Sequence, residues 1–227
     1  MPFKGLTWSR FKEHLRKTAP VYIIGFIICM LLTNLIYTTT RPQTPADREV
    51  LVYLVDSFSD PDPLNACAED ILAYGQTIDE TLEEVRFESI QFNDPEQDYT
   101  SAYLIMARMS VGDGDVYLAS ATATDYLLGA QIGLPLEQYL DEGWLEEYDL
   151  EPVSYTDPET GETEVVALRL DNVDGLLDVG SFNNEGACMF IASNGTNVDT
   201  SMQVAEYIIQ QLMEGNYAPA ESVESAD

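Results

Sequence analysis

The chain has 227 residues, a formal net charge of −30 and a pI near 4.1. Its charge is uneven, because five of the ten basic residues lie in the first 17 positions whereas 39 of the 40 acidic residues follow residue 40. So negative a field repels nucleic acid and anionic lipid headgroups and excludes binding to a phosphate backbone by residues 41–227. Two interpretations of the acidity remain open, a solvated surface or a site for cations or a cationic ligand.

The first element is an apolar run over residues 21–37, which its neighbours extend to 19–39. That length approaches the ~20 residues a helix needs to cross a bilayer. Five basic residues precede the run and none follows before Arg41. The positive-inside rule therefore predicts a single-pass protein of the cell membrane, with a basic cytoplasmic tail over 1–18, a transmembrane helix over 19–39 in the lipid bilayer, and an extracellular remainder. A cleaved signal peptide is the alternative, although no small-x-small cleavage site follows.

Three further segments are expected after this helix. Residues 40–48 contain two prolines and no apolar periodicity, which indicates a short extended stalk. Residues 49–215 are long enough to bury roughly 70% of their unfolded surface and are expected to form one acidic extracellular domain. The small, polar and acidic residues of 216–227 predict a disordered tail.

Within the domain, short apolar or alternating segments are separated by helical patterns. Strands are predicted at 50–55, 86–92, 116–119, 165–170 and 187–192. Helices are predicted at 62–75, 98–109, 172–179 and 199–213, and a chain reversal at 157–161. The mixed pattern of 86–92 is typical of an edge strand. The alternation predicts an α/β fold, with a mostly parallel sheet of about five strands and helices on both faces.

The stretch over residues 98–143 is central to this prediction. Helical spacing places Tyr99, Ala102, Tyr103, Met106 and Met109 on one face of a helix. Gly112 ends that helix, and the continuously apolar strand at 116–119 follows directly. We expect residues 120–124 to form the loop that leaves this strand, and a second helix to follow before Gly143.

The order VLVYLVDSF, helix, RFESIQF, helix, MSVGDGDVYLAS and LPLEQYLDEG resembles the first lobe of the extracellular solute-binding proteins of ABC transporters (periplasmic-binding-protein-like, type II). The similarity extends over about 49–213 and is carried by Gly112, Asp113, Asp115, Val116, Leu134, Pro135, Leu136, Asp141 and Glu142. Only about twenty residues separate Gly143 from Val165, too few for a second lobe. The resemblance therefore implies a single lobe, without the opposing jaw that would close over a ligand.

A candidate ligand site follows from the predicted sheet. In an open parallel sheet, ligands bind outside the carboxyl ends of the strands, near the switch in strand order. The residues that follow the predicted strands are Asp56, Ser57, Phe58, Asn93, Asp94, Ser120, Thr122, Thr124, Ser193 and Asn194. The same residues also suit ordinary roles in loops and helix caps.

The near absence of histidine and lysine limits the kinds of catalysis that the predicted ectodomain could perform. His14 is the only histidine, and no lysine follows Lys17. The predicted ectodomain therefore lacks Ser-His and Cys-His pairs, histidine-ligated zinc and a Schiff-base lysine. Segments 56–62 and 171–175 resemble calcium loops only in part, since neither has the closing glutamate. We expect no enzyme, cofactor or metal site.

Two hypotheses of function remain open. One is a membrane-anchored extracytoplasmic binding module for a small solute, peptide or cation, accessory to transport or sensing, with a membrane permease or another surface protein as partner. The alternative is a structural or protein-interaction ectodomain with a remnant solute-binding fold and no ligand. The two cysteines of the ectodomain, Cys67 and Cys188, are interpreted either as buried thiols or as a disulfide.

Overall fold

The computed structural model describes residues 8–40, 44–94, 99–131, 133–158, 160–178 and 183–217, and within the first range it describes side chains only for 19, 21–35 and 37. The chain forms two compact units, Met1–Gln43 and Thr44–Asp227. Residues 1–7 of the predicted basic tail, 41–43 of the stalk and 218–227 of the predicted disordered tail lie outside the described residues.

The first unit contains α1 (Trp8–Thr40), one continuous helix of 33 residues. Its large apolar side chains between Val21 and Tyr37 are 49–68% exposed where they are described. Over the residues that the structure describes, no helix is both long enough and apolar enough to cross a membrane.

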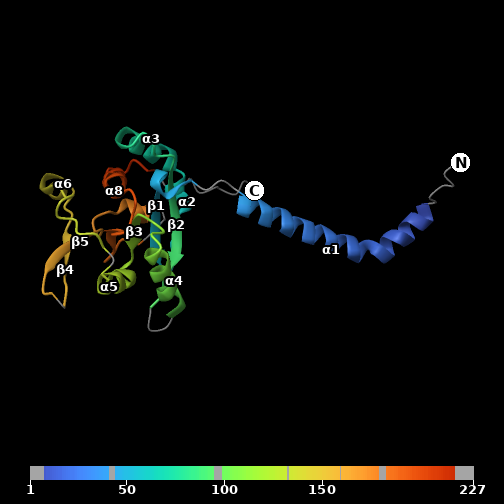
Figure 1. Ribbon diagram of the computed structural model, residues 1–227. Coiled ribbons are helices and arrows are strands. Elements are labelled where there is room, and N and C mark those ends of the chain that lie inside the picture. Colours follow the sequence, from blue (N-terminus) through green and yellow to red (C-terminus); the bar gives the residue numbers. More distant parts are fainter. Residues whose placement is uncertain are drawn as a thin grey trace. The chain divides into compact units, whose positions relative to one another are not determined.

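The second unit is built on a six-stranded sheet (Figure 1). Its strands are β1 (Glu49–Asp56), β2 (Glu84–Gln91), β3 (Val116–Ala119), β4 (Pro152–Thr156), β5 (Thr163–Arg169) and β6 (Cys188–Ile191), in the order β2-β1-β3-β6-β5-β4. β1 pairs in parallel with β2 and β3. β6 is antiparallel to both β3 and β5, and β4 is antiparallel to β5.

The five predicted strands are present, and β2 lies at an edge of the sheet as predicted. The sixth strand, β4, is the first arm of the hairpin whose reversal was predicted at 157–161. The prediction of a mostly parallel sheet is wrong, because three of the five strand pairs described are antiparallel. Between β5 and β6 the described residues contain α7 (Gly175–Asp178), a helix of four residues where a helix over 172–179 was predicted.

Helices cover both faces of the sheet, as predicted. One face carries α2 (Asp62–Asn65), α3 (Ala68–Ile78), α7 and α8 (Val198–Met213), and the other carries α4 (Tyr99–Ser110) and α5 (Ala121–Gly129). A short helix, α6 (Glu142–Glu147), packs Trp144 and Leu145 against the first of these layers.

The predicted helix and stalk boundaries need two corrections. The single helix expected over 62–75 is broken into α2 and α3. At the end of α2, the Asn65 side chain both donates to Phe87 O (2.9 Å) and accepts from Phe87 N (2.9 Å) of the edge strand. The stalk expected to be extended contains a 3₁₀ turn, η1 (Ala46–Arg48).

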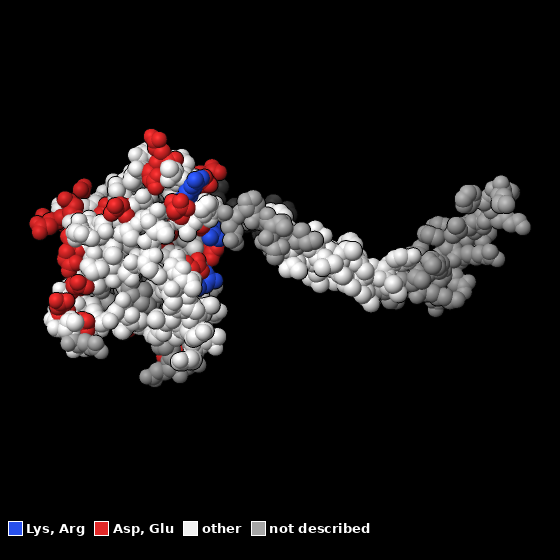
Figure 2. All heavy atoms as spheres, in the orientation of Figure 1, with Lys and Arg blue, Asp and Glu red and all other residues white. Residues whose placement is uncertain are grey.

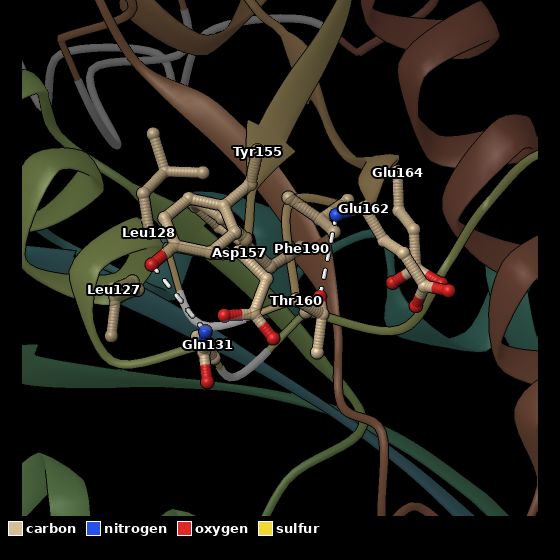
Figure 3. A pocket seen from close by; sticks show the side chains of 11 residues that line it. Leu127, Leu128, Gln131, Tyr155, Asp157, Thr160, Glu162, Glu164 and Phe190 are labelled. Carbon is tan, nitrogen blue, oxygen red and sulfur yellow. Dashed lines mark hydrogen bonds between the residues drawn. The ribbon is translucent and has the colours of Figure 1, made fainter.

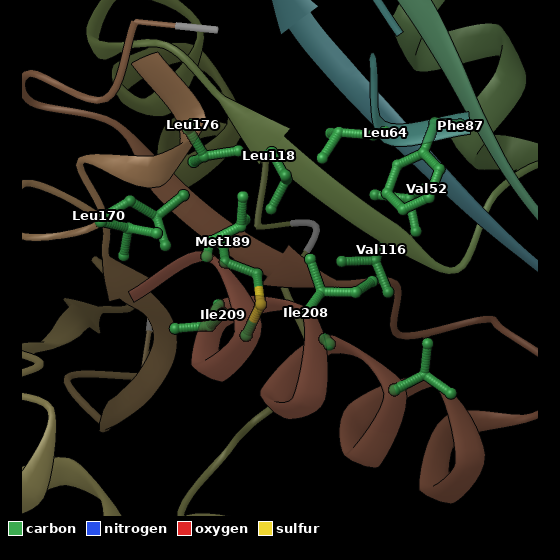
Figure 4. Close-up of a cluster of buried hydrophobic side chains, with 14 of the residues drawn as sticks. Val52, Leu64, Phe87, Val116, Leu118, Leu170, Leu176, Met189, Ile208 and Ile209 are labelled. Carbon is green, nitrogen blue, oxygen red and sulfur yellow. The ribbon is translucent and has the colours of Figure 1, made fainter. Parts of the chain in front are cut away.

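Two hydrophobic cores lie on opposite faces of the sheet. Alternate residues of β1 enter them: Val50, Val52 and Leu54 pack into the first core, whereas Leu51, Tyr53 and Val55 pack into the second. Figure 4 shows the first core, where Ile208 and Ile209 of α8 meet Val116, Leu118 and Met189 of the central strands. A strand covered on both faces needs apolar residues at every position, which explains the unbroken VLVYLV run.

Candidate functional site

The carboxyl ends of β1, β2 and β3 meet at one edge of the sheet, which we call the carboxyl edge. Phe92 N donates to Asp56 O (2.8 Å), and Ser120 N donates to Val55 O (2.9 Å). From β1 the chain adds β2 on one side and β3 on the other, so the strand order switches between β1 and β3. Such a switch point is where open α/β sheets bind ligands.

Most of the candidate residues lie at this carboxyl edge. Those that follow β1, β2 and β3 are Asp56, Ser57, Phe58, Asn93, Asp94, Ser120, Thr122 and Thr124. Ser193 and Asn194 do not, because β6 is antiparallel and its carboxyl end pairs Ile191 with Val116, at the start of β3. Asn194 there donates from Nδ2 to Met109 O (2.5 Å). The expectation that these two residues share the edge is wrong.

Ser120 is the most unusual residue of the carboxyl edge. Residues 120–124 are not the expected loop: Ser120 is the N-cap of α5, and Thr124 N donates to Ser120 O (2.7 Å) in its first turn. Thr124 is buried and its hydroxyl donates to Ala119 O (3.2 Å). The Ser120 side chain is only 9% exposed, and its Oγ has no hydrogen-bond partner among the described residues.

Exposed aromatic side chains flank the carboxyl edge. Phe58, in the loop after β1, is 82% exposed, and Tyr99 and Tyr103 of α4 are 80% and 68% exposed. Of the residues that helical spacing puts on one face of α4, Ala102 and Met109 lie in the core, whereas the two tyrosines are exposed. The apolar stripe of α4 is narrower than its sequence suggests.

The cysteines and the calcium-like loops have structural surroundings. Cys67 packs against the first core and Cys188 lies in the second, so the sheet separates the two thiols. Burial raises the pKa of the Cys188 thiol, which disfavours the reactive thiolate. In the loops, Asp60 accepts from Asp62 N (3.0 Å) and Asp171 accepts from Gly186 N (2.6 Å). In the part of the chain that the structure describes, no three acidic, histidine or cysteine residues are grouped to hold a metal ion.

Sequence reasoning missed a cavity between the last turn of α5 and the β4–β5 hairpin, which we call the hairpin pocket (Figure 3). It is lined by Leu127, Leu128, Gln131, Gly133, Tyr155, Asp157, Thr160, Glu162, Glu164, Val166 and Phe190. The alternation of Tyr155 with Asp157 and of Glu162 with Glu164 across the predicted reversal was the available signal. This alternation predicts that the four side chains share one face of the hairpin, but it does not predict which other segment packs against that face.

Comparison with known proteins does not assign the chain to a family. No protein-family model matches the chain, and no significant match is found among curated proteins or solved structures. The class that the structure itself defines is an α/β domain with a mixed six-stranded sheet and helices on both faces.

Proposed function

We propose that this chain is a membrane-anchored extracytoplasmic binding module that holds a small polar solute at the carboxyl edge, between β1 and β3. One observation carries the proposal: the buried and unpartnered Ser120 hydroxyl lies at the switch point and at the start of α5. A buried hydroxyl without a partner costs about 1–3 kcal/mol. Because this oxygen is buried in the unliganded fold, a solute reaches it only when the start of α5 opens, and its hydrogen bond to the hydroxyl then offsets that cost.

The charges around the carboxyl edge favour neutral or cationic solutes. Asp56 and Asp94 follow β1 and β2, and Asp125 lies in α5. Arg169, at the end of β5, is an ion-pair partner of Asp171 (3.4 Å). Such a field disfavours anions despite the helix N-terminus. The resemblance to one lobe of a solute-binding protein agrees with this site, and the missing second jaw implies weak binding.

Replacing Ser120 by alanine is expected to abolish solute-induced stabilisation while leaving the unliganded fold intact, because the hydroxyl has no protein partner to lose. The measurement is a thermal-shift screen of the full chain in detergent against sugars, amino acids, peptides, amines and calcium. The matched control is Ser193→Ala. Ser193 is exposed and follows β6, at the end of the sheet away from Ser120. No shift for any solute, or an equal shift in the Ser120 variant, would refute the proposed site.

The anchor is part of the proposal and rests on the apolar sequence 19–39 and on the exposure of its described side chains. Substituting arginine for both Ile27 and Leu31 is expected to release the chain from membranes, since each charge costs about 2.5–3.5 kcal/mol at the centre of a spanning helix. Alkaline extraction of membranes from producing cells measures this release. A shortened soluble form of the unaltered chain would argue instead for a cleaved signal peptide.

The second candidate function, a protein-interaction ectodomain, is favoured by the exposed rings of Phe58, Tyr99 and Tyr103. Aromatic residues are enriched at the centres of protein interfaces. The double variant Phe58→Ser, Tyr103→Ser separates the two functions. It should reduce cross-linking to a surface partner, such as a permease, without altering any solute-induced shift.

A further inference from the structure

The hairpin pocket is a cavity of about 160 Å³ with an apolar floor and an acidic rim. Leu127 and Leu128 of α5 and the buried Phe190 of β6 supply the floor. Figure 3 shows the Tyr155 ring among these side chains, with its hydroxyl turned toward Gln131, from whose Nε2 it accepts (3.5 Å). The cavity is smaller than the roughly 300–1,000 Å³ of typical ligand pockets, so it suits an occupant of a few carbon atoms.

The register of the hairpin brings the acidic residues together. Tyr155 lies opposite Glu164, and Asp157 N donates to Glu162 O (2.9 Å). Val153 pairs with Ala167 and Ser154 with Val165, which leaves Val166 as an extra residue of β5. This bulge changes the alternation of β5, so that Val165 packs against the first core while Val166 and Glu164 line the pocket.

Gly133 closes the pocket from the side of the loop that follows α5. It bridges to Ala192 of the chain after β6, and a Cβ at this position would lie 2.6 Å from Val166 O. The loop can therefore approach the bulge this closely only with glycine at position 133. Bulge and loop together give the pocket a defined wall.

The charges of the lining are all of one sign. Asp157, Glu162 and Glu164 contribute three carboxylates, and none of the lining residues is basic. On the face seen in Figure 2, acidic side chains lie on the side of the domain that carries α6 and the hairpin, with no basic side chain among them. The acidic lining therefore disfavours anions and favours a positively charged ligand.

The apolar floor and the aromatic ring select among cations. A metal ion needs several oxygen ligands around one point, and the described residues contain no such group of three. An ammonium group with a short alkyl chain uses the whole lining, because its charge meets the carboxylates and the Tyr155 ring while its carbons cover Leu127 and Phe190. We propose that the hairpin pocket binds a small organic ammonium ion. This site is separate from the carboxyl edge and does not depend on it.

The test is calorimetric titration of the full chain, in a non-ionic detergent, with n-butylammonium chloride and with its neutral analogue 1-butanol. The ammonium ion should bind at least about tenfold more tightly, and added salt should weaken it. Glu164→Gln should weaken binding about fivefold, the effect of one charge near a surface. Tyr155→Leu should also weaken it, through loss of the ring. The matched control is Glu146→Gln, which removes one exposed charge on α6.

Three outcomes would overturn the proposal. Equal binding of butanol would show that charge plays no part. An equal loss in Glu164→Gln and Glu146→Gln would show that only the diffuse acidic field attracts the cation. Loss of binding in Ser120→Ala with retention in Glu164→Gln would place the cation at the carboxyl edge. Retention in Ser120→Ala together with loss in Glu164→Gln is the supporting result, and it stands whether or not the carboxyl edge binds a solute.

Discussion

Replacing Gly175 by alanine is expected to destabilise the α/β domain by about 3 kcal/mol. Gly175 begins α7 and lies directly against the last turn of α8. A Cβ there would lie 2.3 Å from Leu212 O and 2.8 Å from Leu212 C. Both atoms belong to a helix backbone, so no change of rotamer relieves the overlap and α7 must move away from α8. Typical domains have about 5–15 kcal/mol of stability, so the loss is a large part of the total.

Urea unfolding followed by tryptophan fluorescence measures this change, because Trp144 packs against the first core. A Trp8→Phe background removes the signal of the other unit. The matched control is Gly129→Ala in the last turn of α5, where an added Cβ has no neighbour within 4 Å. Alanine should stabilise α5 by up to about 1 kcal/mol there. Equal unfolding midpoints for the two variants would contradict the packing of α7 on α8.

Stability is expected to fall as the pH rises from 4 to 8, and Asp115 is the main reason. Its carboxylate is 8% exposed and accepts from Leu51 N (2.9 Å). Burial raises the pKa of Asp115 to about 6 from its ordinary 3.8, and the hydrogen bond to Leu51 N opposes this shift only in part. A raised pKa means that the folded state holds the proton more tightly than the unfolded state. The resulting stabilisation is complete below about pH 4 and is lost as the pH passes 6, a change of about 2–3 kcal/mol.

Asp115→Asn should flatten this pH dependence, because the asparagine oxygen still accepts from Leu51 N but carries no charge. Urea midpoints at pH 4.5, 6 and 8 measure the effect, with Glu146→Gln as an exposed control. Part of the slope should remain, since burial also raises the pKa of Glu49 and Glu206. An unchanged slope in Asp115→Asn would show that Asp115 is not the responsible group.

Local patterns located the elements well but not their direction. The run at 50–55 predicted a strand because a doubly covered strand is apolar at every position. For the same reason, the apolar run at 187–192 does not indicate whether its strand is parallel or antiparallel to its neighbours. The antiparallel course of β6 depends on its pairing with β3 and β5, and it places Ser193 and Asn194 at the far end of the sheet.

On α4 and α5 too, the local sequence predicted the position of the residues, whereas tertiary contacts decided which of them are buried. Spacing put Tyr99 and Tyr103 on the same face of α4 as Ala102 and Met109. How much of that face is buried depends on what packs against it, and both rings are exposed. Ser120 was recognised as a residue following a strand. That its hydroxyl is buried without a partner follows only from the tertiary structure, in which Ser120 is the N-cap of α5.

The amino-acid sequence was sufficient to predict five of the six strands, helices on both faces of the sheet and the residues that follow β1, β2 and β3, because these depend on neighbours within a few positions. Strand direction, the exposure of α4 and the hairpin pocket depend on contacts between distant segments. The pocket in particular needs the bulge at Val166, the close approach of Gly133 and the end of α5 at one place. No local sequence pattern predicts that these three segments lie together, because their proximity results from how the whole sheet is assembled.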